Sequence, residues 1–185
     1  MLESLLAQGK VIHYLCQDET RLGLKTQSGK VITAKGVKPK VAVQWGRENL
    51  WIYGAIAPLS GEHFVHEYPK LNGECFQEFL DWLSQELGED WAILQMDQAP
   101  AHMSSLIRWP ENIIPLVQPA HSPELNPIER FWQWLKRPLK NQIFPSLQAL
   151  RERVQELFDQ LTLEEVMSVS SYNFILEALF YLASH

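Results

Sequence analysis

Cysteine is scarce in this sequence. The 185 residues include two cysteines, Cys16 and Cys75, and both lie in apolar patterns with no CxxC motif or Cys/His cluster around them. That pattern argues against a disulfide framework and against a structural zinc site. It is typical of a protein from a reducing compartment, so we expect a cytoplasmic location.

Long apolar runs are also missing. The first ten residues, MLESLLAQGK, carry an acid at Glu3 and no basic segment before an apolar one, so we expect no signal peptide. The most apolar late segment, FILEALFYLASH (residues 174–185), is short and is interrupted by Glu177. It is predicted to be a core or docking helix rather than a membrane span, and no membrane partner is expected.

Repeats, low-complexity tracts and Pro/Gly-rich linkers do not occur either, which favours a single domain. Hydrophobic residues make up 46% of the chain, and seven residues are tryptophan. At this length a domain buries roughly 70% of the surface of its unfolded chain. A sizeable core is therefore expected.

Positive charge is in the minority, with 16 Lys and Arg against 22 Asp and Glu and a formal net charge of −6. The bases are nevertheless concentrated, because residues 21–47 include no acid, whereas acids cluster in residues 74–90. One face of the molecule can therefore attract phosphates despite the negative total. The alternative is that these bases are solvated hairpin residues. They are Arg21, Lys25, Lys30, Lys35, Lys38, Lys40 and Arg47.

Apolar patterning predicts strands in the first half and mostly helices in the second. The predicted fold class is α/β: a single domain with a mixed sheet, in which an antiparallel meander precedes parallel strands that alternate with helices. A turn is predicted at residues 46–49, and a capping box from Thr162 to Glu165 opens the helix that follows it. Predicted strands are residues 11–18, 30–35, 40–45, 50–56, 61–68, 91–97 and 113–118, with a short helical linker before the last. Predicted helices are residues 72–87, 126–139 and 147–161 and the one opened by Thr162.

Aspartates follow two of the predicted strands. Asp18 comes after the apolar run VIHYLCQ, and Asp97 comes after WAILQM. The carboxyl ends of strands in an α/β sheet are where ligand sites gather, and neighbouring carboxylates repel each other unless a cation lies between them. Mg²⁺ takes oxygen ligands of this kind. The alternative is that each aspartate caps the loop that follows it.

The segment SPELNPIERFWQWLK contains a third candidate carboxylate. Asn126 suits a helix N-cap, Pro127 the first helical position, and Glu129 the N3 position from which its side chain can reach back to the cap. A third acid beside two aspartates can instead complete a site for two metal ions. Glu124, in the entry loop, is expected to have no catalytic role.

The candidate carboxylates lie in three motifs: QDET at Asp18, MDQAPAH at Asp97 and HSPELNPIERFWQWLK at Glu129. In this order, the motifs resemble those of the DDE transposases of the mariner superfamily, in its bacterial insertion-sequence branch. The resemblance covers roughly residues 12–145. It implies an RNase H-like fold in which Asp18, Asp97 and Glu129 are catalytic and hold two Mg²⁺ or Mn²⁺ ions. It also implies DNA cleavage at terminal inverted repeats and attack by the freed 3′-hydroxyl on target DNA, usually at a TA dinucleotide.

The sequence departs from that family in three respects. Gln98 stands where the family usually has Asn, and the 31 residues between Asp97 and Glu129 are slightly fewer than usual. The family also carries amino-terminal helix-turn-helix modules, whereas this chain begins almost directly at the first catalytic strand. We therefore expect residues 1–185 to be a catalytic domain alone, acting as a homodimer or with a separate helix-turn-helix polypeptide. Two rival interpretations are another RNase H-like nuclease and a non-catalytic remnant that binds DNA or dimerises.

Other side chains are candidates for contact with DNA. His102 can orient a phosphate or a metal-bound water, or it can be a loop histidine with local hydrogen bonds. Trp132 belongs to the apolar stripe of its helix and is expected in the core, whereas Trp134 lies off the stripe and can contact DNA or a partner. The candidates for DNA contact are Lys25, Lys30, Lys35, Lys38, Lys40, His102, Arg130 and Lys136.

Overall fold

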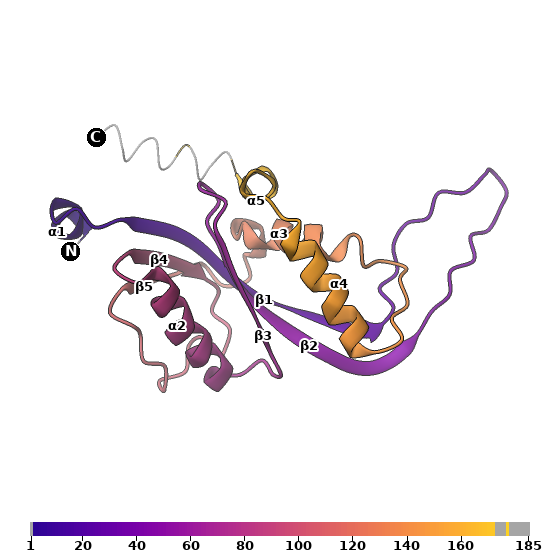
Figure 1. Cartoon of the computed structure of the whole chain (residues 1–185), viewed down its shortest axis with the longest axis horizontal. Coiled ribbons are helices and arrows are strands. Elements are labelled where there is room, and N and C mark those ends of the chain that lie inside the picture. The colour runs from indigo at the N-terminus through magenta and orange to yellow at the C-terminus, as the bar shows by residue number, and fades with distance from the viewer. Residues whose placement is uncertain (1, 173–176, 178–185) are drawn as a thin grey trace.

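A five-stranded mixed sheet forms the centre of the molecule (Figure 1). The computed structural model describes residues 2–172 and residue 177. The strands are β1 (Ile12–Lys25), β2 (Trp45–Ile56), β3 (His63–Tyr68), β4 (Trp91–Met96) and β5 (Ile113–Val117). The helices are α1 (Leu2–Ala7), α2 (Gly73–Leu87), the 3₁₀ turn η1 (Pro123–Leu125), α3 (Ile128–Lys136), α4 (Leu147–Asp159) and α5 (Leu163–Ser170).

The sheet has the predicted combination of antiparallel and parallel pairs. Its strand order is β3-β2-β1-β4-β5, and β1 pairs antiparallel with β2, as β2 does with β3. β4 then lies parallel to β1, and β5 parallel to β4. The chain passes from β3, at one edge of the sheet, to β4, on the far side of β1, through α2. The predicted mixed sheet, a meander followed by parallel strands, is confirmed.

Helices cover both faces of this sheet, and each face has its own core. α2 places its stripe of Phe76, Phe79, Leu80 and Leu83 against one face. α3, α4 and α5 cover the other (Figure 1). Adjacent strand residues point to opposite faces, so Leu15 of β1 belongs to the α2 core and Cys16 to the other. Cys16 and Cys75 are both buried free thiols, as predicted.

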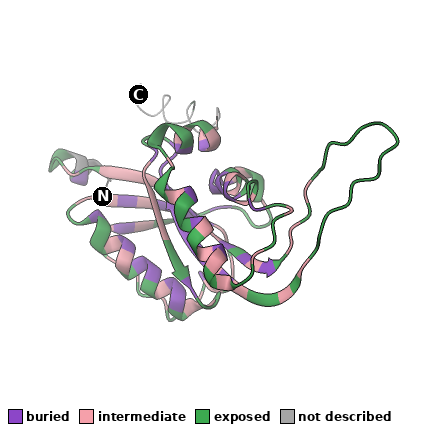
Figure 2. Ribbon diagram, turned by 45° about the vertical axis from the view of Figure 1, so that its right-hand side comes forward, coloured by how far each residue is buried: buried purple, intermediate pink, exposed green. Residues whose placement is uncertain are grey.

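Residues 26–44 form a long exposed loop that projects from the end of β1 and β2 (Figures 1 and 2). The predicted strands at residues 30–35 and 40–45 are wrong, and so is the turn at 46–49, which lies inside β2. The loop has β-branched residues, but Ile32, for example, is fully exposed. Strand propensity reflects packing on a half-buried surface, and here no sheet face covers these side chains.

The remaining elements agree with the sequence more closely. α2, α4 and α5 lie where predicted, and Thr162 and Glu165 form the expected capping box. The helical linker predicted before β5 is wrong, because residues 97–112 form turns and segments without regular secondary structure. α1 was not predicted. The helix predicted at 174–185 lies outside the described residues, apart from residue 177.

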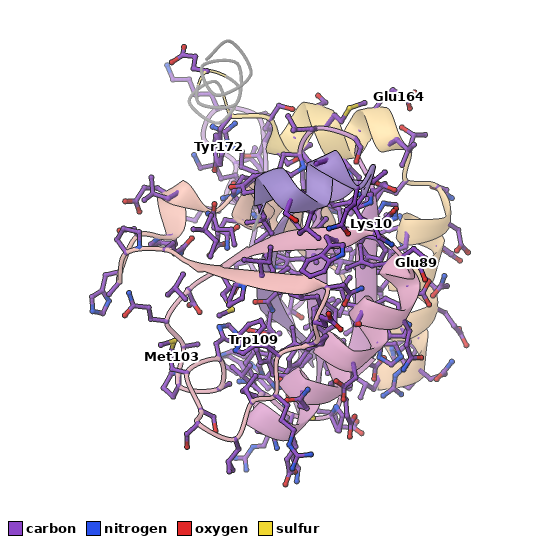
Figure 3. All side chains as sticks on the ribbon, turned by 90° about the vertical axis from the view of Figure 1, so that its left-hand side faces the viewer. Lys10, Glu89, Met103, Trp109, Glu164 and Tyr172 are labelled. Carbon is purple, nitrogen blue, oxygen red and sulfur yellow. The ribbon has the colours of Figure 1, made fainter. Side chains whose placement is uncertain are left out.

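A few specific contacts fix the segments that connect the helices and strands. Lys10, after α1, pairs with Glu89 at 2.6 Å (Figure 3). Trp109, in the loop between β4 and β5, meets the ring of Phe76 edge-on, with centroids 6.2 Å apart.

Among residues 2–172 and 177, no helix has the length and apolar character needed to cross a membrane.

Candidate metal centre

Asp18 and Asp97 belong to two neighbouring parts of the sheet: Asp18 lies in β1, and Asp97 follows β4, the parallel strand beside β1. The pairing of β1 with β4 runs from Ile12 opposite Trp91 to Cys16 opposite Gln95, so both aspartates lie just beyond the end of this parallel ladder. Asp97 directly follows β4, as predicted. Asp18 is not at the end of its strand, as was expected, but in the middle of β1, because β2 continues to pair with β1 beyond the end of the parallel ladder.

Glu129 lines the same cleft as the two aspartates. The cleft has a volume of about 560 Å³ and lies between β1, the loop after β4 and the entry to α3. Asn126 and Gln98 also line it. Glu124 does not, and it is exposed on η1. The structure therefore places the three predicted carboxylates at one cleft and leaves Glu124 outside.

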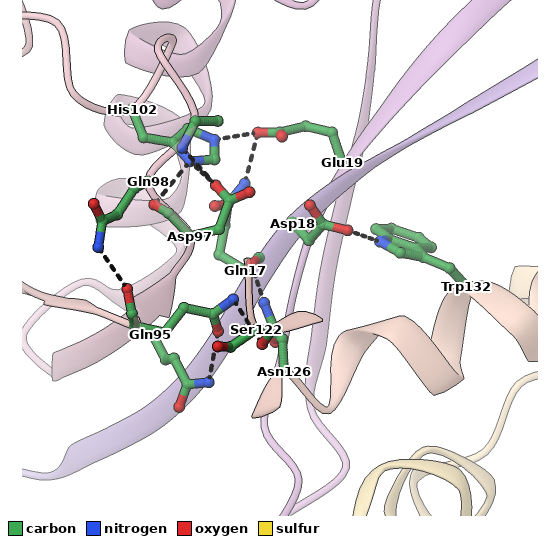
Figure 4. A network of polar contacts seen from close by, with 12 residues as sticks. Gln17, Asp18, Glu19, Gln95, Asp97, Gln98, His102, Ser122, Asn126 and Trp132 are labelled. Carbon is green, nitrogen blue, oxygen red and sulfur yellow. Dashed lines mark hydrogen bonds and ion pairs between the residues drawn. The ribbon is translucent and has the colours of Figure 1, made fainter. Parts of the chain in front are cut away.

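Asp18 is a partly buried carboxylate that accepts a hydrogen bond from one side chain of the described residues. The indole Nε1 of Trp132 donates a hydrogen bond to its Oδ2 at 3.0 Å (Figure 4). Burial is the main reason that the pKa of the Asp18 carboxyl rises to about 8. Repulsion from Glu19, and more weakly from Glu129 and Asp97, raises the pKa in the same direction. A cation in the cleft would favour the charged form of Asp18.

Asp97 is held by His102, which is itself held by Glu19 (Figure 4). His102 Nδ1 lies 2.8 Å from Asp97 Oδ1, and its Nε2 lies 2.9 Å from Glu19 Oε1. The backbone N–H of Ala99 also donates to Asp97 Oδ1, at 2.9 Å. In the described part of the chain, Asp97 Oδ2 accepts no hydrogen bond, which leaves it available to a ligand.

The imidazole of His102 carries a positive charge between these carboxylates. Burial lowers the pKa of His102, but the hydrogen bonds from its ring to Asp97 and Glu19 outweigh that effect and raise the pKa to about 10. The hydrogen bond from His102 in turn lowers the pKa of Asp97. His102 has a fully buried side chain, which favours the local hydrogen-bonding role over contact with a phosphate.

Glu19 is the residue of this site that the sequence interpretation missed. Its side chain is 4% exposed, and its Oε1 also accepts a hydrogen bond from Gln17 Nε2 at 2.8 Å. One feature of the sequence could have pointed to Glu19: it directly follows Asp18 in an apolar strand. Because side chains alternate along a strand, Glu19 points to the face opposite that of Asp18. A carboxylate on a covered face needs a cationic partner, and only the fold shows that His102 supplies it.

The start of α3 differs from the capping arrangement that was predicted for Asn126 and Glu129. α3 begins at Ile128, and the Asn126 side chain donates to the backbone oxygen of Gln17 at 2.9 Å. Asn126 Oδ1 accepts only a long bond, 3.4 Å, from the N–H of Ile128. Within the described residues the Glu129 side chain makes no hydrogen bond back to the cap, so the capping role predicted for Glu129 is wrong. Asn126 instead ties the entry of α3 to β1, and the Glu129 carboxylate is left to line the cleft.

The candidate DNA contacts fall into two groups. Lys30, Lys35, Lys38 and Lys40 are exposed on the projecting loop, and Lys25 precedes it with its ammonium 5.0 Å from the ring centroid of Trp45. The second group is on α3, where the guanidinium of Arg130 lies over the ring of Tyr172 and Lys136 is partly buried. Burial lowers the pKa of Lys136, and attraction to Glu129 and Asp18 opposes that shift. The role of these residues in binding DNA stays a prediction.

The two tryptophans of α3 differ in position as the stripe predicts. Trp132 is buried, at 2% exposure. Trp134 is partly buried and stacks on Phe131, with ring centroids 5.7 Å apart. Gln98, the departure from the family motif, donates from its amide to the backbone oxygen of Gln118 at 3.0 Å. Its longer side chain is thus used to bridge the strand ends beside the cleft.

The donor set suits a hard divalent cation. Carboxylate oxygens are the ligands that Mg²⁺ and Mn²⁺ prefer. Among the described residues, those that line the cleft include no thiol and one imidazole, that of the loop residue His121. Across residues 2–172 and 177, however, no group of three His, Cys, Asp or Glu side chains is already arranged closely enough to hold an ion. Metal binding here therefore requires the carboxylates to turn toward one another.

Comparisons with known proteins agree with this geometry. A family model of the DDE superfamily endonucleases matches residues 13–151. The uncharacterized protein y4pE/y4sA of Sinorhizobium fredii is 34% identical over 96 residues, which cover 51% of this chain and 71% of that protein. The transposable element Tcb1 transposase of Caenorhabditis briggsae is 34% identical over 139 residues, which cover 67% of this chain and 50% of the transposase.

Solved structures share the fold. The Mos1 strand transfer complex matches with a TM-score of 0.68 at 20% identity, over 90% of this chain and 54% of the Mos1 chain. The Mos1 mariner paired end complex with Mn matches with a TM-score of 0.66 at 18% identity, over 85% and 51%. The chain thus spans about half the length of the transposases it matches, and the predicted RNase H-like fold is confirmed. Because the family match covers residues 13–151, from before Asp18 to beyond Glu129, the chain belongs to the DDE superfamily endonucleases.

Proposed function

We propose that this chain is a transposase catalytic domain that cleaves DNA at transposon ends and joins the freed 3′-hydroxyl to target DNA. The observation that carries the proposal is the cleft itself, which Asp18, Asp97 and Glu129 all line. Structures of the same fold include Mos1 paired-end complexes with a transposon end, with Mn and with Mg. They support a DNA substrate and a divalent metal for this cleft.

Asp18, Asp97 and Glu129 are the residues that would hold two Mg²⁺ or Mn²⁺ ions. Bound there, such ions supply charge that stabilises both the attacking and the leaving oxygen of an in-line phosphoryl displacement. The protein itself orients the carboxylate of Asp97. His102 and the N–H of Ala99 hold its Oδ1, and its Oδ2 remains available to a metal ion. The pKa of Asp18 is raised to about 8, so its charged form is disfavoured unless a cation lies nearby.

Contact with DNA is assigned to the basic loop and to α3. The loop lysines are exposed on a segment that projects away from the sheet, where they can follow a phosphate backbone. Arg130 and Lys136 lie on the helix that also carries Glu129. The DNA substrates would be the terminal inverted repeats and a target, at a TA dinucleotide. A homodimer, or a separate helix-turn-helix polypeptide that reads the repeats, completes the proposed assembly.

The test is nicking of DNA that carries the element's ends, in the presence of Mn²⁺. Asp18→Ala, Asp97→Ala and Glu129→Ala are each expected to abolish cleavage. Glu124→Ala is the matched control, because Glu124 is an exposed carboxylate five residues before Glu129 that does not line the cleft. Cleavage that survives in all three alanine variants would refute the assignment.

A non-catalytic remnant is the second candidate, and one observation favours it. In the described part of the chain no three ligands are already gathered to hold an ion. If the wild-type chain binds DNA ends but never cuts them, with or without a supplied helix-turn-helix partner, the remnant interpretation replaces the transposase. Cleavage without preference for the element's ends would instead indicate another RNase H-like nuclease.

A further inference from the structure

The buried indole of Trp132 is hydrogen-bonded to Asp18, one of the proposed metal ligands. Trp132 is 2% exposed on α3, packed with Phe131 and Ile128 in the core beneath the sheet. An indole N–H can only donate, and in a buried position it needs an acceptor. That acceptor is Oδ2 of Asp18, at 3.0 Å. A core tryptophan is thus bonded directly to one of the three proposed ligands.

Gly54 makes room for this ring. It is the residue of β2 that pairs directly with Asp18 in the antiparallel register. A Cβ at position 54 would lie 2.6 Å from Cη2 and 2.9 Å from Cζ2 of Trp132, closer than carbon atoms approach. The ring therefore lies against bare backbone next to Asp18, and any side chain at position 54 would displace it.

We propose that Trp132 is a positioning residue that fixes the direction of the Asp18 carboxylate, in space that Gly54 leaves open. Trp132 follows Glu129 by three residues on α3, so the two side chains lie on neighbouring positions of the same helix face. Docking of this one helix then orients two ligands: Glu129 directly, and Asp18 through the indole. The inference rests on the proposed function, because it gives Asp18 the role of a metal ligand.

The test measures Mn²⁺ binding to the full chain by isothermal titration calorimetry, without DNA. Trp132→Phe keeps an aromatic ring and removes the N–H. Loss of a hydrogen bond to a metal ligand commonly weakens metal binding by about 10- to 100-fold, and we expect a weakening of about tenfold here. Trp134→Phe is the matched control, because Trp134 is on the same helix and stacks on Phe131; its Mn²⁺ affinity should equal that of the wild type.

A second measurement uses the wild-type chain and does not depend on how well a variant folds. In ¹H–¹⁵N spectra, the indole N–H resonance of Trp132 should shift as Mg²⁺ is added, because its acceptor becomes a metal ligand. The indole of Trp91, at the opposite end of β4, should not shift.

The outcomes separate the two proposals. If the wild type binds no Mn²⁺, the metal-dependent function fails and the positioning role fails with it. If the wild type and Trp132→Phe bind Mn²⁺ equally, and the Trp132 resonance does not move with Mg²⁺, only the positioning role is overturned. Weaker binding in Trp132→Phe, together with the Mg²⁺-dependent shift, supports it.

Discussion

Replacing His102 by leucine should destabilise the metal-free protein strongly. The leucine keeps most of the buried volume, so the loss arises mainly from Glu19, whose side chain is 4% exposed and whose cationic partner is removed. Removing one partner of a buried ion pair typically costs about 3–5 kcal/mol. Gln17 still donates to Glu19, so we expect a loss near the lower end, about 3 kcal/mol. That is a large share of the roughly 5–15 kcal/mol by which domains are stable.

The assay is urea denaturation in EDTA at neutral pH, followed by circular dichroism, on a double-mutant cycle. The cycle comprises Glu19→Met, His102→Leu and the double variant. Because an apolar pair leaves no buried charge, the double variant should be more stable than His102→Leu alone, even though it carries one more substitution. If the two single effects simply add in the double variant, Glu19 and His102 are not coupled and the ion-pair reasoning is refuted.

Three further predictions concern Asp18, the projecting loop of residues 26–44, and α5. In EDTA, Asp18→Asn should raise the free energy of unfolding at pH 7 by at least about 1 kcal/mol. The raised folded-state pKa of Asp18 means that wild-type stability falls as the pH rises from about 4 to about 8, and this part of the fall should vanish in the variant. Lys35→Gln combined with Lys38→Gln should weaken binding to all DNA sequences and lower the slope of log affinity against log salt by about two, measured by fluorescence anisotropy. An unchanged slope would mean that these lysines are merely solvated. Thr162→Ala removes the capping bond to the N–H of Glu165 and should cost about 1 kcal/mol in the same urea assay, whereas Thr162→Ser should cost much less.

The central sheet could be predicted because its local and long-range signals agree. The last three residues before Asp18 and the last three before Asp97 are all buried, so both faces of these strands are covered there, which is the pattern of central strands. The amphipathic stripe of α2 occupies the connection between β3 and β4, so a parallel crossover followed from the pattern itself. The motif around Glu129 then placed the third carboxylate at the same end of the sheet.

What could not be predicted depends on contacts between segments far apart in the sequence. Residues 26–44 have the composition of a hairpin but no surface to pack on, and composition alone does not show the absence of a partner. Asn126 has the identity of an N-cap, yet its side-chain amide is taken by the backbone of Gln17, 109 residues earlier. The pairing of Glu19 with His102 spans 83 residues and is likewise set only by the fold.

The central claim is that Asp18, Asp97 and Glu129 together hold divalent ions. It is tested most directly by X-ray diffraction from crystals of the protein bound to a DNA end and Mn²⁺, recorded where manganese scatters anomalously. Two anomalous peaks about 4 Å apart, contacted by these three carboxylates, are the predicted result. A cleft without manganese, or manganese held by other side chains, would contradict it.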